Sequence, residues 1–387
     1  MPTVAIIATL NTKSAEANFL KGCISGLGED CVIVDASINS RESQLSGEEK
    51  LAAMAQASER VATELTKLAC RSELKAVVGI GGGTGSQIVA GVFSGAAVDA
   101  WKVLITTQVL DTREIPGLEE VTIIPAVCDI EGLNRLTKHV LRGAAASVVG
   151  LAGMDWEHTI QAGDELVAMT ALGVTSPGVR QAKSALEAAR FECAVFHANG
   201  HGGNTMARLA KKGGFGGILD YTIHELVSLG MDPETSVSEN RFDAPDGCPR
   251  VLLPGGVNFL TKIRGRAFGM GREKWQKYTH SPQITHIGLS VEAMAGLGWN
   301  LAERLSGSGS HAAIIIPMGG FSSEDRRGGA LENRKGREAF ASGFAAASGG
   351  EVEILHTDGH VNDPATAELA AGVFREMVGA KVKEDLR

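Results

Sequence analysis

Residues 79–89, GIGGGTGSQIV, form the stretch of this sequence whose residue types best suit ligand binding. Five glycines, Thr84 and Ser86 follow the apolar residues 76–78 and lead into further apolar residues. Glycine lets backbone N–H groups approach an anion, and the N-terminus of a following helix adds a favourable dipole. The stretch has no Walker A lysine, and it does not open the first strand–helix unit as a GxGxxG motif does. The residues alone leave two interpretations open, a phosphate-binding loop and a tight structural turn.

Other polar residues follow the strands expected on either side of this loop. Residues 9–13, TLNTK, follow the first strand, residues 106–108 follow the fourth, and Asp129 follows the fifth. Ligands of doubly wound sheets bind beyond the carboxyl ends of the strands, at the switch point in strand order. Lys13 would supply the cation that the glycine loop lacks. The predicted binding residues are Thr9, Asn11, Thr12, Lys13, Gly81, Gly82, Gly83, Thr84, Gly85, Ser86, Thr106, Thr107 and Asp129.

The second half of the chain has polar loops of its own. Two HxxxH spacings begin at His197 and His356, and Asp220 opens a further polar stretch, residues 220–225. On a helix this spacing would place both histidines on one face, but these segments contain glycine and resemble loops, so we expect no metal site. A polar pocket that uses histidine as an acid or base is one interpretation, and capping and loop hydrogen bonds are the other. The acid/base candidates for such a pocket are His197, Asp220, His360 and Asp363.

The composition limits the classes of function. The net charge is −8, and the most basic stretch, residues 326–337, is interrupted by Gly and Glu, which argues against a nucleic-acid surface. Six scattered cysteines form no CxxC pair, and no GxSxG elbow indicates a serine hydrolase. No apolar run approaches the roughly 18 residues of a membrane helix, and the N-terminus lacks the basic region of a signal peptide. We expect a cytoplasmic protein that binds neither nucleic acid nor a membrane.

The order of the elements predicts a sheet that would bring these loops together. Continuous apolar runs such as residues 4–9 are typical of strands covered on both faces. In the first half we expect helices at residues 14–27, 47–70 and from about 86, between strands at 4–9, 31–35, 76–80, 102–107 and 121–125. A second series follows, with helices at 179–189 and 206–212 and with strands at 166–173, 192–198, 217–222, 250–253, 284–289, 312–317 and 351–356.

This pattern predicts an α/β protein with two Rossmann-like, doubly wound parallel-sheet subdomains and a cleft between them. The first subdomain spans residues 1–155 and the second residues 165–387. A helix at about 134–160 marks the boundary, and a C-terminal helix at 364–378 is expected to pack across.

The loops together resemble those of the Tm-1 family, which includes bacterial proteins of the UPF0261 type. The match covers nearly the whole chain, and it rests on the stretches ATLNTKSAEANFLK, GIGGGTGSQIV, VCDIEGLNRLTKHVLRGAA, TALGVTSPGV, VFHANGHGGNTMARL, ILDYTIHEL, VLLPGGVNF and HVNDPATAELA. The resemblance implies two Rossmann-like subdomains, ATP bound in the first together with Mg²⁺, and self-association as a homodimer. Many relatives carry a C-terminal TIM-barrel domain that this sequence lacks, so the resemblance also suggests a separate TIM-barrel protein as a partner.

The resemblance places the family's motifs on the loops already described. In the TLDTK-like turn Asn11 stands where Asp is usual, which removes a carboxylate that magnesium could use. Asp129 and Asn134 match a DIxGLNR stretch, and His360 begins an HxNDP-like motif that includes Asp363. The family implies a catalytic role for none of these residues.

Three functions follow from these patterns. The preferred one is an ATP- or nucleotide-binding protein whose ligand is held by the glycine-rich loop after the third strand. Because no motif for hydrolysis lies nearby, we expect binding there without fast cleavage of ATP. The alternatives are a metabolic enzyme acting on an acidic or phosphorylated small molecule in the cleft, and a non-catalytic protein-interaction module.

Overall fold

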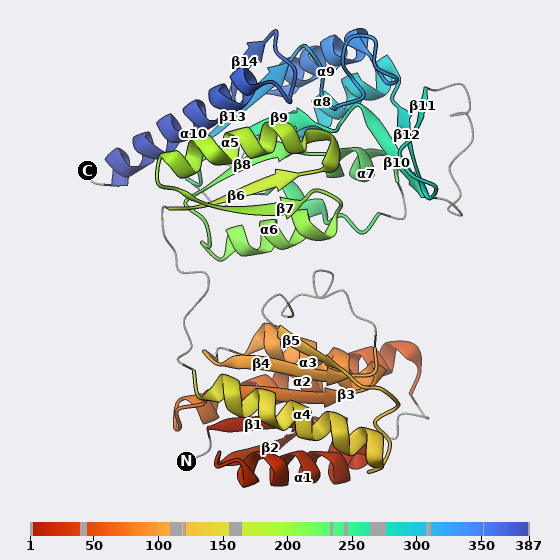
Figure 1. Cartoon of the computed structure of the whole chain (residues 1–387), viewed down its shortest axis with the longest axis vertical. Helices are drawn as coiled ribbons and strands as arrows, with labels where there is room; N and C mark the ends of the chain where they lie inside the picture. The colour runs from red at the N-terminus through yellow and green to blue at the C-terminus, as the bar shows by residue number, and fades with distance from the viewer. Residues whose placement is uncertain are drawn as a thin grey trace. The chain divides into compact units, whose positions relative to one another are not determined.

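A computed structural model shows that the chain forms two compact units, unit 1 (Met1–Thr159) and unit 2 (Ile160–Arg387), each with its own parallel sheet (Figure 1). The predicted cleft between the subdomains stays a prediction. The structure describes residues 3–38, 45–96, 98–108, 118, 121–154, 165–232, 235–243, 247–263, 276–306, 311–350 and 352–385.

Unit 1 is built on five parallel strands, which lie in the order β2 (Cys31–Asp35), β1 (Val4–Ala8), β3 (Ala76–Gly81), β4 (Trp101–Thr106) and β5 (Val121–Pro125). One face of the sheet packs against α1 (Leu10–Gly26) and α4 (Arg135–Ala152). The other face packs against α2 (Gly47–Ala69) and α3 (Gly83–Gly95).

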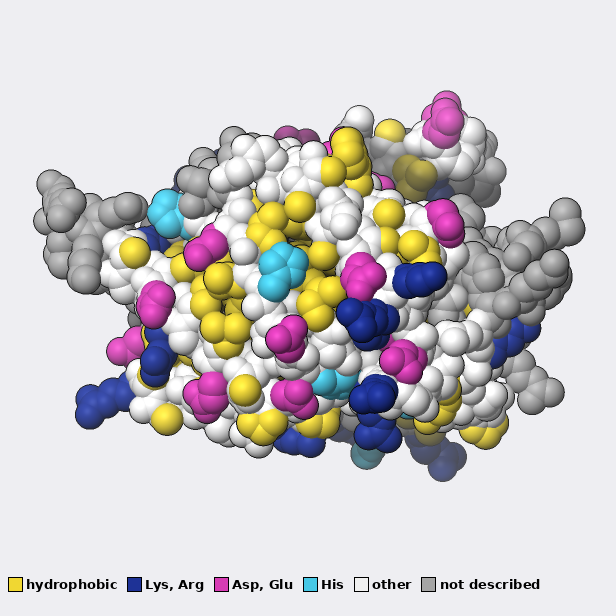
Figure 2. Space-filling view, turned by 90° about the horizontal axis from the view of Figure 1, so that it is seen from above, with side chains coloured by type: hydrophobic (Ala, Val, Ile, Leu, Met, Phe, Trp, Pro, Cys, Tyr) yellow, Lys and Arg dark blue, Asp and Glu magenta, His cyan; other side chains and the backbone are white. Residues whose placement is uncertain are grey.

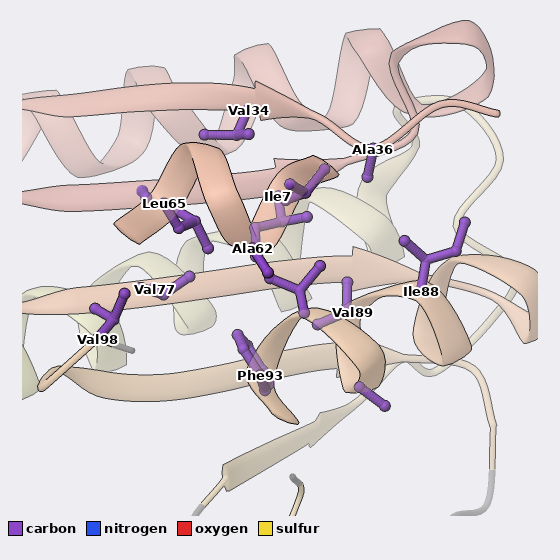
Figure 3. Close-up of a cluster of buried hydrophobic side chains, with 14 of the residues drawn as sticks. Ile7, Val34, Ala36, Ala62, Leu65, Val77, Ile88, Val89, Phe93 and Val98 are labelled. Carbon is purple, nitrogen blue, oxygen red and sulfur yellow. The ribbon is translucent and has the colours of Figure 1, made fainter. Parts of the chain in front are cut away.

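Strand β1, which lies between β2 and β3, has a continuous apolar sequence because both of its faces are buried. Ala5 and Ile7 pack with α2 and α3, whereas Val4, Ile6 and Ala8 pack with α1 and α4. Figure 3 shows the first of these clusters, in which side chains from the sheet and from both helices meet. Since helices cover both faces of the sheet, no position of β1 is left for a polar side chain.

Unit 2 is built on six parallel strands, which lie in the order β14 (Glu353–Thr357), β13 (Ala312–Pro317), β9 (Arg250–Gly255), β8 (Gly217–Thr222), β6 (Leu166–Ala171) and β7 (Glu192–His197). On one face lie α5 (Ser176–Ala188) and α10 (Pro364–Asp385), which pack on each other and on the sheet. The other face is covered by α6 (His201–Lys211), α7 (Glu225–Met231), α8 (Val291–Leu305) and α9 (Arg334–Ala347). The 3₁₀ turns are η2 (Gly173–Thr175) and η3 (Glu239–Phe242).

A small antiparallel sheet in unit 2 corrects one expectation. The strand predicted at residues 284–289 exists as β12 (Ile284–Gly288), but it does not extend the main sheet. It pairs antiparallel with β10 (Phe259–Ile263) on one side and with β11 (Lys277–Thr279) on the other. A pairing of this kind depends on partners elsewhere in the chain, so the apolar pattern of one strand does not reveal it.

The two main sheets share one strand order. In each, the first strand lies next to the edge, with the second strand on one side and the third on the other: β2-β1-β3 in unit 1 and β7-β6-β8 in unit 2. This is the flavodoxin-like doubly wound order, whose switch point lies between the first and third strands. The predicted fold class, α/β with two Rossmann-like doubly wound parallel sheets, is confirmed.

Several helix ends differ from those predicted. Helices α1, α3 and α6 begin at Leu10, Gly83 and His201, several residues earlier than expected, so parts of the predicted loops are first helical turns. At each of these N-termini the N-cap residue makes no side-chain capping hydrogen bond. For α3 and α6 the N-cap residue is a glycine, so the usual sequence signal for a helix start was missing. Helix α4 ends at Ala152, short of the predicted 160.

Two surface properties bear on binding partners. Among the described residues, no helix has both the length and the apolar character needed to cross a membrane. On the face shown in Figure 2, Lys and Arg side chains are interspersed with Asp and Glu and do not gather into one basic patch.

Candidate functional site

The carboxyl ends of β1, β3 and β4 lie side by side at one edge of the unit 1 sheet. Ala8 is paired with Ile80, and Gly81 is paired with Thr106. Strands β1 and β3 flank the switch point, so the turns that follow them leave the sheet next to each other. The structure thus brings together residues 9–13 and residues 81–86, the two stretches that the sequence singled out.

The turn from β3 to α3 is tight and open to solvent at its tip. Gly81 is required there because an added Cβ would overlap the backbone of Gly85 and Ser86. Gly82 and Gly83 have more room, since a Cβ would lie 3.7 Å from Thr107 Oγ1 and 3.9 Å from Gln108 Nε2, respectively. Gly83 is exposed, and no side chain among the described residues caps the N-terminus of α3. The first N–H groups of this helix are therefore available to an anion.

The turn from β1 to α1 is held by the end of β2. Asp35 Oδ1 accepts hydrogen bonds from the backbone N–H of Leu10 at 3.1 Å and of Ser37 at 2.9 Å, and from the Ser37 hydroxyl at 2.6 Å. Partial burial opposes ionisation of Asp35, but these hydrogen bonds outweigh it and lower the pKa of the carboxyl. Asp35 therefore fixes the turn as a carboxylate. The sequence prediction missed it, although an acidic residue at the end of the second strand is a known feature of dinucleotide-binding sheets.

Lys13 interrupts the first turn of α1. Its backbone, at φ −122° and ψ 19°, departs from helical geometry and produces a kink. Its side chain is half-buried, and within the described part of the chain no carboxylate pairs with it. The neighbouring hydroxyls of Thr9 and Thr12 are 2.9 Å apart and bonded to each other. Lys13 is thus an uncompensated positive charge beside the switch point.

Two predicted ligand donors have partners within the protein. Ser86 and Thr106 are both buried, and their hydroxyl oxygens are 2.6 Å apart. The Ser86 hydroxyl also donates to the carbonyl of Gly81 at 3.2 Å, and Thr106 Oγ1 accepts from the N–H of Gln108 at 3.0 Å. Ser86 and Thr106 therefore connect the turn from β3 to α3, called the glycine turn below, to the loop after β4. Thr107 is half-buried and lies beside Gly82.

Asp129 is placed further from the switch point than the other predicted residues. It follows β5, the edge strand, which is separated from β3 by β4. Its side chain is exposed, and the loop that contains it is tied to α1 because Glu16 Oε1 accepts from the Gly132 N–H at 2.6 Å. Asn134 caps the helix that follows. The structure therefore gives Asp129 no direct place in the pair of turns.

In unit 2, Asp220 belongs to a buried ionic cluster. Asp220 accepts from Arg241 at 2.9 Å through both of its oxygens, from Arg250, and from the Thr170 hydroxyl at 2.8 Å. Burial raises the pKa of Asp220, but the two arginines outweigh burial and hold it well below its usual range. Arg241 also donates to Glu225 at 2.8 Å, so two carboxylates balance two guanidinium groups. Asp220 is thus a permanently ionised structural carboxylate.

The buried ionic cluster explains one glycine of residues 197–204, the HANGHGGN stretch. At Gly203 an added Cβ would overlap the carboxylate of Glu225 and the guanidinium of Arg241. The N–H of Gly200 donates to Glu225 Oε1 at 3.1 Å, which fixes the start of α6. Gly203 and the start of α6 therefore fit around the buried ion pair.

The remaining acid/base candidates do not converge. His197 ends β7 and His360 follows β14, and these strands are the opposite edges of the main sheet. His360 Nε2 donates to the Ser322 carbonyl at 2.8 Å, and its Nδ1 accepts from the Asn362 N–H at 3.0 Å. Asp363 Oδ2 accepts from the His360 N–H at 2.7 Å. His360 and Asp363 therefore stabilise the turn before α10.

The strand order and the open helix N-terminus at the switch point define a class, that of two-unit doubly wound α/β proteins. Models of the uncharacterised family UPF0261 match both units, its N-terminal domain over residues 2–157 and its C-terminal domain over residues 164–378. The chain belongs to this family.

Named relatives agree with this assignment. A UPF0261 protein of Rhizobium meliloti (strain 1021) is 28% identical over 97% of this chain and 99% of its own length. A UPF0261 protein of Clostridium tetani is 25% identical over 98% of this chain and 99% of its own length. The ToMV susceptible protein tm-1(GCR26) of Solanum lycopersicum is 29% identical over 69% of this chain, a match that spans 36% of the plant protein.

Proposed function

We propose that unit 1 binds ATP, with the phosphate groups at the switch point between β1 and β3. The observation that carries this proposal is the pairing of Ala8 with Ile80, which makes the TLNTK turn and the glycine turn neighbours. Ligand sites of doubly wound sheets lie at this position. The resemblance to the Tm-1 family led to the same expectation for the first subdomain.

The chemistry of the two turns suits a phosphate group. The N–H groups at the start of α3 present partial positive charge, and the exposed Gly83 leaves the approach open. Lys13 adds a full positive charge that no described carboxylate neutralises. Thr107, beside Gly82, offers a hydroxyl. In this proposal Ser86 and Thr106 support the site and do not touch the ligand, and Mg²⁺ enters with ATP.

Substitution of Lys13 tests the cationic side of the site. We expect Lys13→Ala to weaken ATP binding by about 10- to 100-fold, because a hydrogen bond to a charged group contributes about 1.5–3 kcal/mol. Lys21→Ala is the matched control, since Lys21 is exposed further along α1 and should leave the Kd unchanged. Isothermal titration calorimetry with ATP and Mg²⁺ measures both.

Substitution of Gly83 tests the glycine turn. Gly83 is the first residue of α3, a position where proline fits a helix and removes only one free N–H. We expect Gly83→Pro to weaken ATP binding by about 10-fold or more, as loss of one charge-assisted hydrogen bond would. Gly83→Ala keeps the N–H and should bind like the wild type. Equal affinity for the proline and alanine variants, or no binding of ATP by the wild type, would refute the proposed site.

The geometry of unit 2 does not favour the alternative of an enzyme that uses the four acid/base candidates. Asp220 is enclosed by arginines, and His197 and His360 follow opposite edge strands. Self-association and a TIM-barrel partner remain proposals from the resemblance. Sedimentation of the purified chain, alone and with ATP, tests the homodimer.

A further inference from the structure

A second group of residues in unit 2 has the donor set of a metal site. His286 lies on β12, His280 follows β11, and Glu324 lies in the loop after β13. One ring nitrogen of each histidine and one carboxylate oxygen of Glu324 all lie within 4.8 Å of one another. These residues are 6 to 44 positions apart in the sequence, so the fold alone brings them together.

Two polar atoms in this group are buried without a partner. His286 is 5% exposed, and its Nδ1 makes no hydrogen bond within the described residues. Glu324 Oε2 is equally enclosed and makes none within the same part of the chain. A buried polar atom without a partner costs about 1–3 kcal/mol, and native proteins pair the great majority of such atoms. A cation bound between the two side chains would satisfy both.

The surroundings keep the His286 ring in place. Phe259 stacks on it with ring centroids 4.1 Å apart, and His280 stacks nearby with centroids 4.9 Å apart. In the described part of the chain, the fold therefore fixes the orientation of the His286 ring without using its Nδ1 atom.

We propose that His280, His286 and Glu324 bind a zinc ion. Two imidazole nitrogens and one carboxylate oxygen form the set of three protein ligands found in zinc sites that keep a fourth position open. Zinc bonds of about 2.0–2.2 Å hold ligand atoms less than 4.8 Å apart, the distance within which these three atoms lie. His280 is exposed and has room to adjust to the ion, whereas His286 is held by its packing. The site differs from the two HxxxH spacings and is independent of the nucleotide site in unit 1.

Zinc titration of the complete chain, without a histidine tag and after dialysis against a chelator, tests this site. We expect one Zn²⁺ per chain, a rise in the unfolding temperature with added zinc, and no competition from Mg²⁺, which prefers oxygen ligands. Loss of a residue that only supports a metal ligand lowers metal affinity by about 10- to 100-fold. His280→Ala removes a ligand itself, so we expect it to weaken zinc binding by more than that. His139→Ala, an exposed histidine on α4, is the matched control.

Glu324→Gln separates metal binding from folding. It keeps the side-chain volume and the backbone of the loop but removes the anionic ligand. We expect this variant to keep its circular dichroism spectrum and its metal-free unfolding temperature, and to lose the stabilisation by zinc. If the wild type binds no zinc, or if His280→Ala and Glu324→Gln bind it as the wild type does, the proposal is wrong.

Discussion

Ser86 on α3 and Thr106 at the end of β4 share a hydrogen bond of 2.6 Å between two buried hydroxyls. From the sequence alone, both residues are predicted to bind the ligand. The structure assigns their hydroxyls to each other, which ties the glycine turn to the neighbouring strand. A phosphate above this turn would meet backbone N–H groups, with the hydroxyl pair beneath them as support.

Ser86→Ala is expected to lower stability and to leave ATP affinity essentially unchanged. Loss of one net hydrogen bond costs about 1 kcal/mol in the free energy of unfolding. Urea denaturation measures that change, and calorimetry measures the Kd for ATP. Ser147→Ala, an exposed serine on α4, is the control and should not destabilise the protein. A large loss of ATP affinity at unchanged stability would show that Ser86 touches the ligand.

Gly203→Ala is expected to destabilise unit 2 by about 3 kcal/mol or more. The new Cβ would displace Glu225 from Arg241, and breaking a buried ion pair costs about 3–5 kcal/mol. Gly372→Ala is the matched control, because Gly372 also lies in a helix but has open space at its Cβ. The control should gain about 0.5–1 kcal/mol, as alanine does over glycine in a helix. Equal unfolding curves for the two variants would contradict the role given to Gly203.

The strands and the neighbouring turns at the switch point of unit 1 were predictable because both depend on local patterns. A continuous apolar run such as residues 4–8 fits a covered parallel strand. The polar turns after such strands must share one edge of the sheet. Chain order and hydropathy therefore suffice to group Lys13 with the glycine loop.

The ionic cluster and the histidine group were not predictable in this way. Asp220 is paired with Arg241, which lies in a 3₁₀ turn, and with Arg250 on β9. Glu324 lies near His286 but belongs to the loop after β13, a strand of the other sheet. No helical or strand period relates such residues. The helix start at Gly83 was also missed, because its N-cap residue is Gly82, which has no side chain to mark a helix N-terminus in sequence.

Asp220→Asn is expected to destabilise the protein by about 3–5 kcal/mol. The substitution keeps the shape of the side chain but leaves Arg241 and Arg250 with Glu225 as the remaining anion of the cluster. Chemical denaturation followed by circular dichroism measures the loss. Asp358→Asn, at an exposed position after β14, is the control and should change stability little. If Asp220→Asn were as stable as the wild type, the Asp220 carboxylate would not be what holds the buried ionic cluster together.

His224 should make the stability of unit 2 depend on pH. Its Nδ1 donates to the Gly256 carbonyl at 2.7 Å, and its Nε2 accepts from the Thr261 hydroxyl at 3.0 Å. Burial lowers the pKa of His224 to about 4, against which the hydrogen bond to Gly256 has a smaller opposing effect. In the unfolded chain a histidine has a pKa of about 6.5. Between these values the unfolded state binds a proton that the folded state does not bind.

The unfolding free energy should therefore be highest above pH 6.5 and should fall as the pH drops toward 4. Each pH unit between the two pKa values changes the unfolding free energy by about 1.4 kcal/mol. His224 alone therefore contributes roughly 3 kcal/mol to that fall. We expect His224→Asn to be less stable than the wild type at neutral pH. Its unfolding free energy should also depend less steeply on pH, by up to the slope that one bound proton produces. His356→Asn, at an exposed position on β14, should keep the wild-type slope. Urea denaturation between pH 4 and 7, with a chelator present, measures the unfolding free energy of all three proteins. If it depends on pH equally in His224→Asn and the wild type, His224 is not a neutral, buried side chain.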